Sequence, residues 1–355
     1  MGLVAGEGVG VRRGASFLLC FVCFAGGAPV VLAQEPLATD KPSAVALLRE
    51  EARLLAPRVH SPLGKALLAA VPALPAVAAV RVVHYNRTSR EALSPEAASK
   101  RTAAELEGFE RRELDEHFYY YTKYGTPLAA VRALDLAGQA GLASVDGAKV
   151  LDFGFGSIGQ LRLLASLGAD VTGVEVDQLL QQLYAAPGDT GAIPRASAAG
   201  AGRVGSLRLL FGSFPGDAKL VAAAGTGYAL FISKNTLKRG YIHPERDVEP
   251  RLLVHLGVDD EAYVHAVHSL LAPGGLMLIY NLSPAPSKPD EPYKPWSDGR
   301  TPFARELFEA QGFEIIAFDQ DDTPEARAWG ATLGWGEQMD LDSDLFGTYT
   351  LVRKR

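Results

Sequence analysis

The sequence predicts an α/β fold, in which a doubly wound and mainly parallel sheet of seven strands follows a helical N-terminal extension. Two observations lead to this prediction. From about residue 149 onward, short apolar runs of strand length alternate with helical segments, the order that a parallel sheet requires. A glycine-rich turn, Gly154 to Gly159, separates the first run from the first helix of this region, as in units that hold a nucleotide-containing ligand.

The first 33 residues have the pattern of a targeting segment. Arg12 and Arg13 form a short basic region, the stretch Ser16 to Ala33 is apolar, and small residues precede Gln34 as signal peptidase requires. We expect residues 1–33 to be a signal peptide, with an uncleaved membrane anchor as the alternative. The chain would then be exported, to the periplasm or outside the cell, or cytoplasmic if the start site is misassigned.

Composition narrows the function classes. A formal net charge of −6 provides no general attraction to DNA or RNA, so no nucleic-acid partner is expected. Both cysteines, Cys20 and Cys23, lie in the targeting segment, so the mature chain would contain no disulfide and no thiolate nucleophile. The seven histidines show no metal-ligand spacing, since His265 and His268 have no evident acidic partner, and we expect no metal site.

Residues 34–141 are predicted to form the helical extension, which would cap the rest of the chain. Leu47, Leu48, Leu54 and Leu55 recur at helical spacing among charged residues. Ser94-Pro95-Glu96 is a typical helix start and predicts a charged helix over residues 94–117. A further helix is predicted over residues 128–142, directly before the first strand of the sheet.

Residues 142–355 are predicted to form the sheet domain. Its seven strands are expected near Val150–Phe153, Asp170–Glu175, Leu207–Phe211, Tyr228–Ser233, Leu276–Asn281, Phe313–Phe318 and Tyr349–Arg353. Helices are expected after the first, second, fourth and fifth strands. The segment from Ala185 to Gly205 is rich in glycine and alanine and is predicted to be a mobile surface loop.

The glycine turn matches two classes of cofactor site. Gly154, Gly156 and Gly159 form a literal G-x-G-x-x-G, and Glu175 follows Gly154 by 21 residues, as in dinucleotide-binding folds. Asp152 argues against a dinucleotide, because a carboxylate there would face the phosphates with the wrong sign. It suits a ligand that carries an ammonium group.

These motifs together resemble the class I S-adenosylmethionine (SAM)-dependent methyltransferases, which have a Rossmann-like fold. The matching residues are Val150 to Gly156, the acid Glu175, and Leu271-Ala272-Pro273-Gly274-Gly275. The resemblance implies that the last two strands form an antiparallel end of the sheet. It also implies SAM as the cofactor and transfer of its methyl group to a small-molecule or protein acceptor.

The resemblance assigns roles to residues of the turn and of two neighbouring loops. Asp152 would hold the amino group of SAM, Glu175 would accept from both ribose hydroxyls, and Gly154 and Gly156 would allow close approach of the backbone. Ser213 stands where the family often has an acid at the adenine amino group. Phe214 would stack on the adenine ring or pack in the core.

Two aromatic segments are predicted to border the site. The cluster from Tyr119 to Tyr124 precedes the sheet, where the family often has a lid, and we include Tyr124 among the cofactor contacts. The stretch from Ser283 to Arg300 contains five prolines and Trp296 and follows the strand that bears Tyr280. We expect Tyr280 and Trp296 to contact the substrate, although packing between domains is an equally good interpretation of both segments.

The stretch after the fourth strand would face the transferred methyl group. It contains Lys234 and Asn235, expected to bind the substrate, and His243 and Tyr241, in that order the candidate general bases. A structural role for His243 is the alternative. Two other functions stay open: an exported, non-catalytic module that kept the methyltransferase fold, and an NAD-dependent oxidoreductase. The membrane is expected as a partner only if the N-terminal segment is uncleaved.

Overall fold

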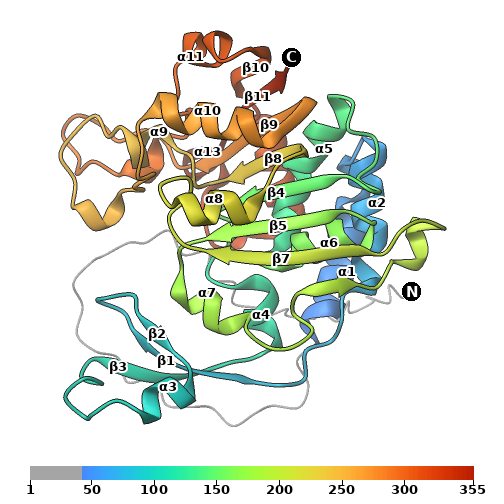
Figure 1. Cartoon of the computed structure of the whole chain (residues 1–355). Coiled ribbons are helices and arrows are strands. Elements are labelled where there is room, and N and C mark those ends of the chain that lie inside the picture. Colours follow the sequence, from blue (N-terminus) through green and yellow to red (C-terminus); the bar gives the residue numbers. More distant parts are fainter. Residues whose placement is uncertain (1–41) are drawn as a thin grey trace, which may run out of the picture.

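The structure is a computed structural model that describes residues 42–355 (Figure 1). The signal peptide or anchor predicted for residues 1–33, with both cysteines, lies outside the described residues. Among residues 42–355, no helix is long and apolar enough to cross a membrane.

All seven predicted strands form, within a central sheet of eight (Figure 1). The strands of this sheet are β4 (Lys149–Phe153), β5 (Asp170–Glu175), β6 (Gly191–Ile193), β7 (Gly205–Phe211), β8 (Tyr228–Lys234), β9 (Leu271–Ser283), β10 (Phe313–Asp321) and β11 (Phe346–Lys354). Their order is β10-β11-β9-β8-β4-β5-β7-β6. Strands β7, β5, β4, β8 and β9 are parallel, whereas β11 lies antiparallel between β9 and β10. The predicted fold class, with its antiparallel end, is confirmed.

The eighth strand, β6, lies in the segment that we predicted to be a mobile loop. It pairs antiparallel with β7 at the edge of the sheet. Arg195 then holds the rest of the segment, because its guanidinium donates to Asp146 and to the carbonyl oxygens of Leu167, Ala199, Gly200, Ala201 and Arg203. The prediction of a free loop was wrong because β6 pairs with β7 and because the partly buried Arg195 satisfies four carbonyl groups between Ala199 and Arg203.

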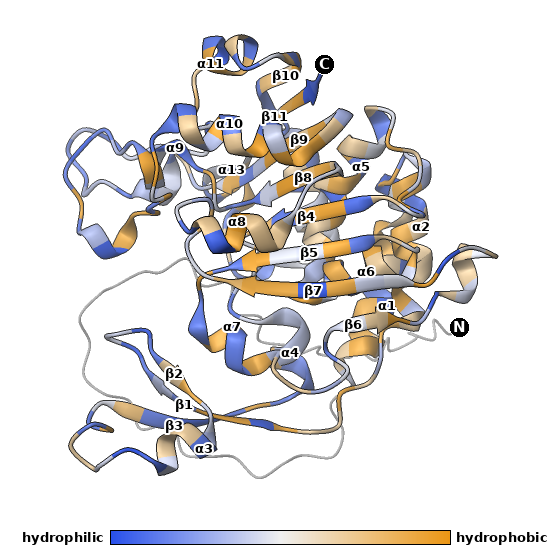
Figure 2. Cartoon of the chain, in the orientation of Figure 1, coloured by the Kyte–Doolittle hydropathy of each residue, from blue (hydrophilic) through white to orange (hydrophobic). Residues whose placement is uncertain are grey.

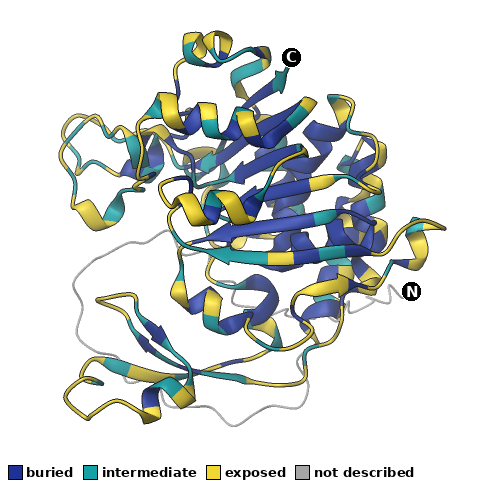
Figure 3. Ribbon diagram, viewed as in Figure 1, coloured by how far each residue is buried: buried dark blue, intermediate teal, exposed yellow. Residues whose placement is uncertain are grey.

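Helices cover both faces of the central sheet. One face carries α1 (Ala44–Leu55), α2 (Pro62–Ala70), α5 (Val131–Gln139), α6 (Gly159–Ser166) and α12 (Thr323–Thr332), and the other carries α8 (Ala218–Ala224), α10 (Asp260–Leu270) and α11 (Arg305–Ala310). The shorter helices are α3 (Pro95–Ser99), α4 (Glu116–Tyr121), α7 (Gln178–Leu183), α9 (Arg239–Ile242) and α13 (Leu341–Asp344). Figure 3 shows that the strands between the two layers are mostly buried.

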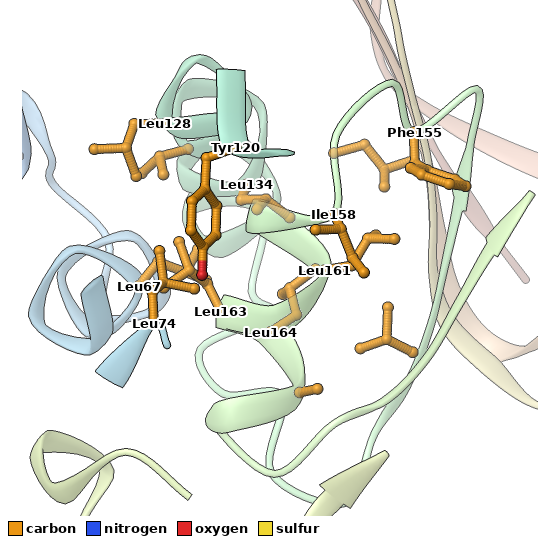
Figure 4. Close-up of a cluster of buried hydrophobic side chains, with 14 of the residues drawn as sticks. Leu67, Leu74, Tyr120, Leu128, Leu134, Phe155, Ile158, Leu161, Leu163 and Leu164 are labelled. Carbon is orange, nitrogen blue, oxygen red and sulfur yellow. The ribbon is translucent and has the colours of Figure 1, made fainter. Parts of the chain in front are cut away.

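Burial on both faces explains the apolar runs from which the strands were predicted. In β4, every residue after Lys149 is buried, and Figure 2 shows the central strands in largely hydrophobic colours. On the first face, Leu67 of α2, Leu134 of α5 and Leu164 of α6 belong to one cluster, which Figure 4 shows around the α6 helix.

The N-terminal extension is only partly helical, which corrects the prediction. Between α2 and α4 the chain forms a small antiparallel sheet of β1 (Arg81–Asn86), β2 (Ala92–Leu93) and β3 (Phe109–Leu114), in the order β2-β1-β3. The predicted helix over residues 94–117 is helical only in α3 and at the start of α4. Strand pairing prevails here because β1 offers a full partner, from Arg81 opposite Leu114 to Asn86 opposite Phe109.

Candidate functional site

The turn between β4 and α6 is built around two glycines in the left-handed region. Gly154 has φ +71° and Gly156 has φ +61°. A Cβ atom on Gly154 would lie 2.1 Å from Thr236 Oγ1, and one on Gly156 would lie 3.0 Å from Tyr124 Cδ2. Glycine is therefore required at both positions, by conformation and by the close approach of two side chains.

Asp152 is buried beneath this turn. It is 4% exposed, and its carboxylate accepts a hydrogen bond from Gln160 Nε2 at 3.2 Å. Burial raises the pKa of Asp152 to about 7; Glu175 adds to the increase, while the Gln160 hydrogen bond and the Lys234 charge oppose it. A buried acid of this kind is readily ionised when a cation binds beside it.

Glu175, the last residue of β5, holds the turn in place from the neighbouring strand. Its Oε1 accepts from the N–H groups of Val176 at 2.8 Å and Asp177 at 3.3 Å, and its Oε2 accepts from the N–H of Gly156 at 3.3 Å. Burial raises its pKa above the ordinary value. A carboxylate has about four acceptor positions, so Glu175 can accept a further hydrogen bond from a ligand hydroxyl.

The chain after α4 covers the turn, and we call residues 122–126 the cover segment. Thr122 Oγ1 donates to the carbonyl oxygen of Gly156 at 2.9 Å. Lys123 Nζ lies 2.5 Å from Asp177 Oδ2, and the Tyr124 hydroxyl donates to the same carboxylate at 3.4 Å. Tyr124 is 48% exposed, and desolvation, with the charges of Glu175 and Asp177, raises the pKa of its hydroxyl well above the ordinary value.

The other aromatic residues of the predicted lid lie in the core. Tyr119, Tyr120 and Tyr121 are at most 1% exposed. Their hydroxyls donate to Asp189 Oδ1, to the carbonyl oxygen of Pro75 and to Glu51 Oε1, respectively. For these three residues the packing alternative is the one observed. The carbonyl oxygen of Tyr120 accepts from Ser157 Oγ at 2.6 Å, but of the four tyrosines only Tyr124 lies over Gly156.

The loop after β7 offers little to a ligand ring. Ser213 is exposed, and its carbonyl oxygen accepts from the N–H of Asp217 at 2.8 Å. Phe214 is 2% exposed and packs against Phe153 with 6.0 Å between ring centroids. Of the two interpretations of Phe214, packing in the hydrophobic core is therefore the one observed.

Some residues at the end of β8 lie near the glycine turn, and others only connect strands of the sheet. Lys234 ends β8 on the same face as Asp152, and Thr236 covers Gly154. Asn235 has φ +63°, its N–H donates to the carbonyl oxygen of Tyr280 at 3.0 Å, and its Oδ1 accepts from the N–H of Leu282 at 2.7 Å. The side-chain oxygen of Asn235 therefore joins β8 to β9 rather than facing a substrate.

Tyr280 is also buried, where a substrate does not reach it. It is 1% exposed, and its hydroxyl donates to Asp322 Oδ2 at 3.0 Å. Asp322 in turn accepts two hydrogen bonds from the buried guanidinium of Arg132. The predicted role of Tyr280 in substrate binding is corrected, because Tyr280 belongs to a buried polar network under α5 and α12.

Trp296 is half-buried, and its carbonyl oxygen accepts from Lys238 Nζ at 3.4 Å.

The two candidate bases lie in and next to α9. His243 Nε2 lies 2.8 Å from Asp260 Oδ2, and this pair joins the end of α9 to the start of α10. Burial raises the pKa of Tyr241 to about 12, so its phenolate is scarce at neutral pH. Their catalytic role stays a prediction.

Sequence reasoning missed two buried polar side chains, Gln160 at the turn and Lys238 after β8. Gln160, eight residues after Asp152 in the first turn of α6, reaches back to the strand end. Lys238 is 3% exposed and donates to the carbonyl oxygens of Leu282 and Trp296. The spacing of a strand, a turn and a helix could have indicated Gln160, whereas the partners of Lys238 come from segments distant in the sequence.

The chain was compared with known proteins. No protein-family model and no curated protein matches it. Among solved structures, a SAM-dependent methyltransferase from Mesorhizobium loti is 16% identical with a TM-score of 0.36, over 62% of this chain and 98% of that one. Phosphoethanolamine N-methyltransferase 2 from Haemonchus contortus, bound to S-adenosylhomocysteine (SAH), is 14% identical with a TM-score of 0.38, over 69% and 62%.

A third solved structure, the [4+2]-cyclase SpnF, is 16% identical with a TM-score of 0.36, over 88% of this chain and 96% of that one. Nearly all the solved structures that resemble the chain are SAM-dependent methyltransferases, but SpnF is named for a cyclisation. Likeness at this level of identity and TM-score says nothing about the activity or substrate of this chain.

Proposed function

We propose that this protein binds SAM at the turn between β4 and α6 and transfers its methyl group to a small-molecule or protein acceptor. The observation that supports this most is the pair of buried carboxylates, Asp152 and Glu175, at the ends of neighbouring strands beside two left-handed glycines. Asp152 would accept from the ammonium group of the methionyl part, and Glu175 from a ribose hydroxyl. A dinucleotide fits less well, because Asp152 would oppose its phosphates.

The chemistry that bound SAM supplies is an electrophilic methyl group on a sulfonium, which an acceptor attacks in line. The protein residues bind and orient the two reactants, and this suffices where the acceptor atom carries no proton. Where it does, a base at the carboxyl end of β8 is needed, and His243 and Tyr241 remain the candidates there. The high pKa of Tyr241 makes it the weaker of the two.

A second candidate function is an exported, non-catalytic binding module. It is favoured by the side chains of Tyr124 and Thr236, which occupy the space directly over Gly156 and Gly154. A cofactor could lie against the glycines only after these side chains turn away. The targeting pattern of residues 1–33 agrees with this candidate, since SAM is a cytosolic metabolite in the organisms we would expect.

Radiolabelled SAM distinguishes these functions. The full chain is incubated with S-adenosyl-[methyl-³H]methionine and with separate small-molecule and protein fractions, and SAH formation is measured. We expect SAH to form with one fraction, and Glu175→Ala to lower the rate at limiting SAM at least about 10-fold through lost hydrogen bonds to the carboxylate. The exposed Glu107→Ala serves as the matched control and should leave the rate unchanged.

SAM binding without SAH formation in any fraction would favour the binding module. Binding of NAD together with failure to bind SAM would contradict both proposals and select the oxidoreductase.

A further inference from the structure

Lys234 and Asp152 lie on neighbouring strands at the carboxyl edge of the sheet. In the parallel register, Asp152 pairs with Ile232, and Lys234 pairs with Tyr280. Because side chains alternate along a strand, Lys234 is on the same face as Ile232 and Asp152, one pleat nearer to the strand end. Both Asp152 and Lys234 therefore face the helix layer that begins with the glycine turn.

Lys234 is partly buried, and its amine has no hydrogen-bond acceptor in the part of the chain that the structure describes. Among residues 42–355, no hydrogen bond from Lys234 Nζ is seen, whereas Lys238 Nζ donates to two carbonyl oxygens. Burial lowers the pKa of Lys234 to about 8, and Asp152 opposes that decrease, so the amine is mostly charged at pH 7. A partly buried ammonium whose three donors have no acceptor among residues 42–355 is well suited to bind an anion.

The other charges around the pair do not neutralise Lys234. Glu175 acts on Asp152 and is already bonded to three backbone N–H groups. Burial lowers the pKa of Lys238 to about 7, so this neighbour adds part of a positive charge and no negative charge. Farther along the same face, Tyr280 and Arg132 are both engaged by Asp322. Asp152 and Lys234 thus present one carboxyl group and one amine that can both make further hydrogen bonds.

We infer that Lys234 binds the α-carboxylate of the methionyl part of SAM while Asp152 binds its ammonium group. An α-amino acid carries an ammonium group and a carboxylate on one carbon atom. A site that binds both groups therefore requires a negative and a positive side chain close together. Lys234 would then make the site discriminate against amines that lack the carboxylate. This inference rests on the proposed function and adds a specificity-determining residue to it.

Three ligands separate the contributions of the two charges. SAH carries both groups, its decarboxylated analogue S-adenosyl-3-thiopropylamine carries only the ammonium, and 5′-methylthioadenosine carries neither. Their dissociation constants are measured by isothermal titration with the full chain, with Lys234→Met, and with Lys234→Arg, which keeps the charge. The exposed Lys219→Met is the matched control, and a thermal melt verifies that each variant is folded.

The wild-type protein should bind SAH about 10- to 100-fold more tightly than the decarboxylated analogue, as one charge-assisted hydrogen bond would provide. Lys234→Met should reduce this ratio below about 3-fold and leave the affinity for methylthioadenosine unchanged, whereas Lys234→Arg and Lys219→Met should keep most of the ratio.

An undiminished ratio in Lys234→Met would overturn the role of Lys234 and leave the proposed function intact. Failure of the wild-type protein to bind any of the three ligands would overturn both.

Discussion

His243 is held in a partly exposed pair with Asp260, with 44% of the histidine side chain accessible. Exposed pairs of this kind contribute little, so His243→Ala should lower the free energy of unfolding by less than about 1 kcal/mol. It should leave the affinity for SAH unchanged. Urea denaturation and calorimetric titration measure the two quantities. These results would agree with a structural role of His243. A large loss of methyl transfer with unchanged SAH binding would contradict that role and show that His243 is the base.

The sequence could predict residues whose role depends on neighbours in the chain. Asp152, Gly154 and Gly156 lie at the turn because a strand, a tight turn and a helix start define their positions locally, and Glu175 joins them because β5 pairs with β4. The side chains of other predicted site residues are directed by contacts that no local pattern contains. Tyr280 faces Asp322, which is 42 residues away, and Phe214 is covered by the core.

Helix α1 contacts the cover segment through one carboxyl group, that of Glu51. Glu51 accepts hydrogen bonds from Thr126 Oγ1 at 2.5 Å and from the Tyr121 hydroxyl at 3.1 Å, on both sides of residues 122–125. Burial raises the pKa of Glu51 from 4.5 to about 7, against the effect of the two hydrogen bonds. Glu51 therefore fixes the chain on both sides of Tyr124.

This raised pKa predicts a pH dependence of stability. A carboxyl group whose pKa is higher in the folded state stabilises the protein fully below its unfolded pKa, and that contribution is lost as the pH rises through the folded pKa. The free energy of unfolding should fall between about pH 4.5 and about pH 7, and the Asp152 carboxyl, whose pKa is also about 7, should add to this fall.

Glu51→Gln should reduce the fall by an amount on the order of 3 kcal/mol, as measured by urea denaturation at pH 5 and pH 8. The exposed Glu107→Gln is the control and should leave the fall unchanged. The same fall in Glu51→Gln as in the wild-type protein would mean that Glu51 is already ionised in the folded state.

The strands of the central sheet could be predicted because most of them are buried on both faces and therefore read as continuous apolar runs. The strand β3 could not, because its sequence Phe109-Glu-Arg-Arg-Glu-Leu114 is mostly charged and alternates only weakly. The extended conformation of β3 is stabilised by pairing with β1. It is also stabilised by the guanidinium of Arg112, which lies 5.7 Å from the Tyr85 ring and 5.6 Å from the Phe118 ring. Such partners are visible only in the folded chain.

Across the whole molecule, the N-terminal helices and the central sheet share one hydrophobic cluster. Leu48 of α1 and Leu67 of α2 are fully buried in the same cluster as Leu230 of β8 and Leu278 of β9. Residues 42–141 thus stabilise the sheet directly as well as supplying the cover segment. At the far side, the turn of the small sheet meets a loop that follows α9, since Arg90 donates to the carbonyl oxygen of Arg251 at 3.0 Å.

Calorimetric titration of SAH into the full chain tests most directly whether the turn between β4 and α6 is a SAM site. We predict that SAH binds the wild-type protein, that Glu175→Ala weakens binding at least about 10-fold, and that NAD does not bind. SAH at about one hundred times its dissociation constant should also raise the free energy of unfolding by about 2.7 kcal/mol. Equal affinity of the wild-type protein and Glu175→Ala, or binding of NAD without SAH, would contradict the account.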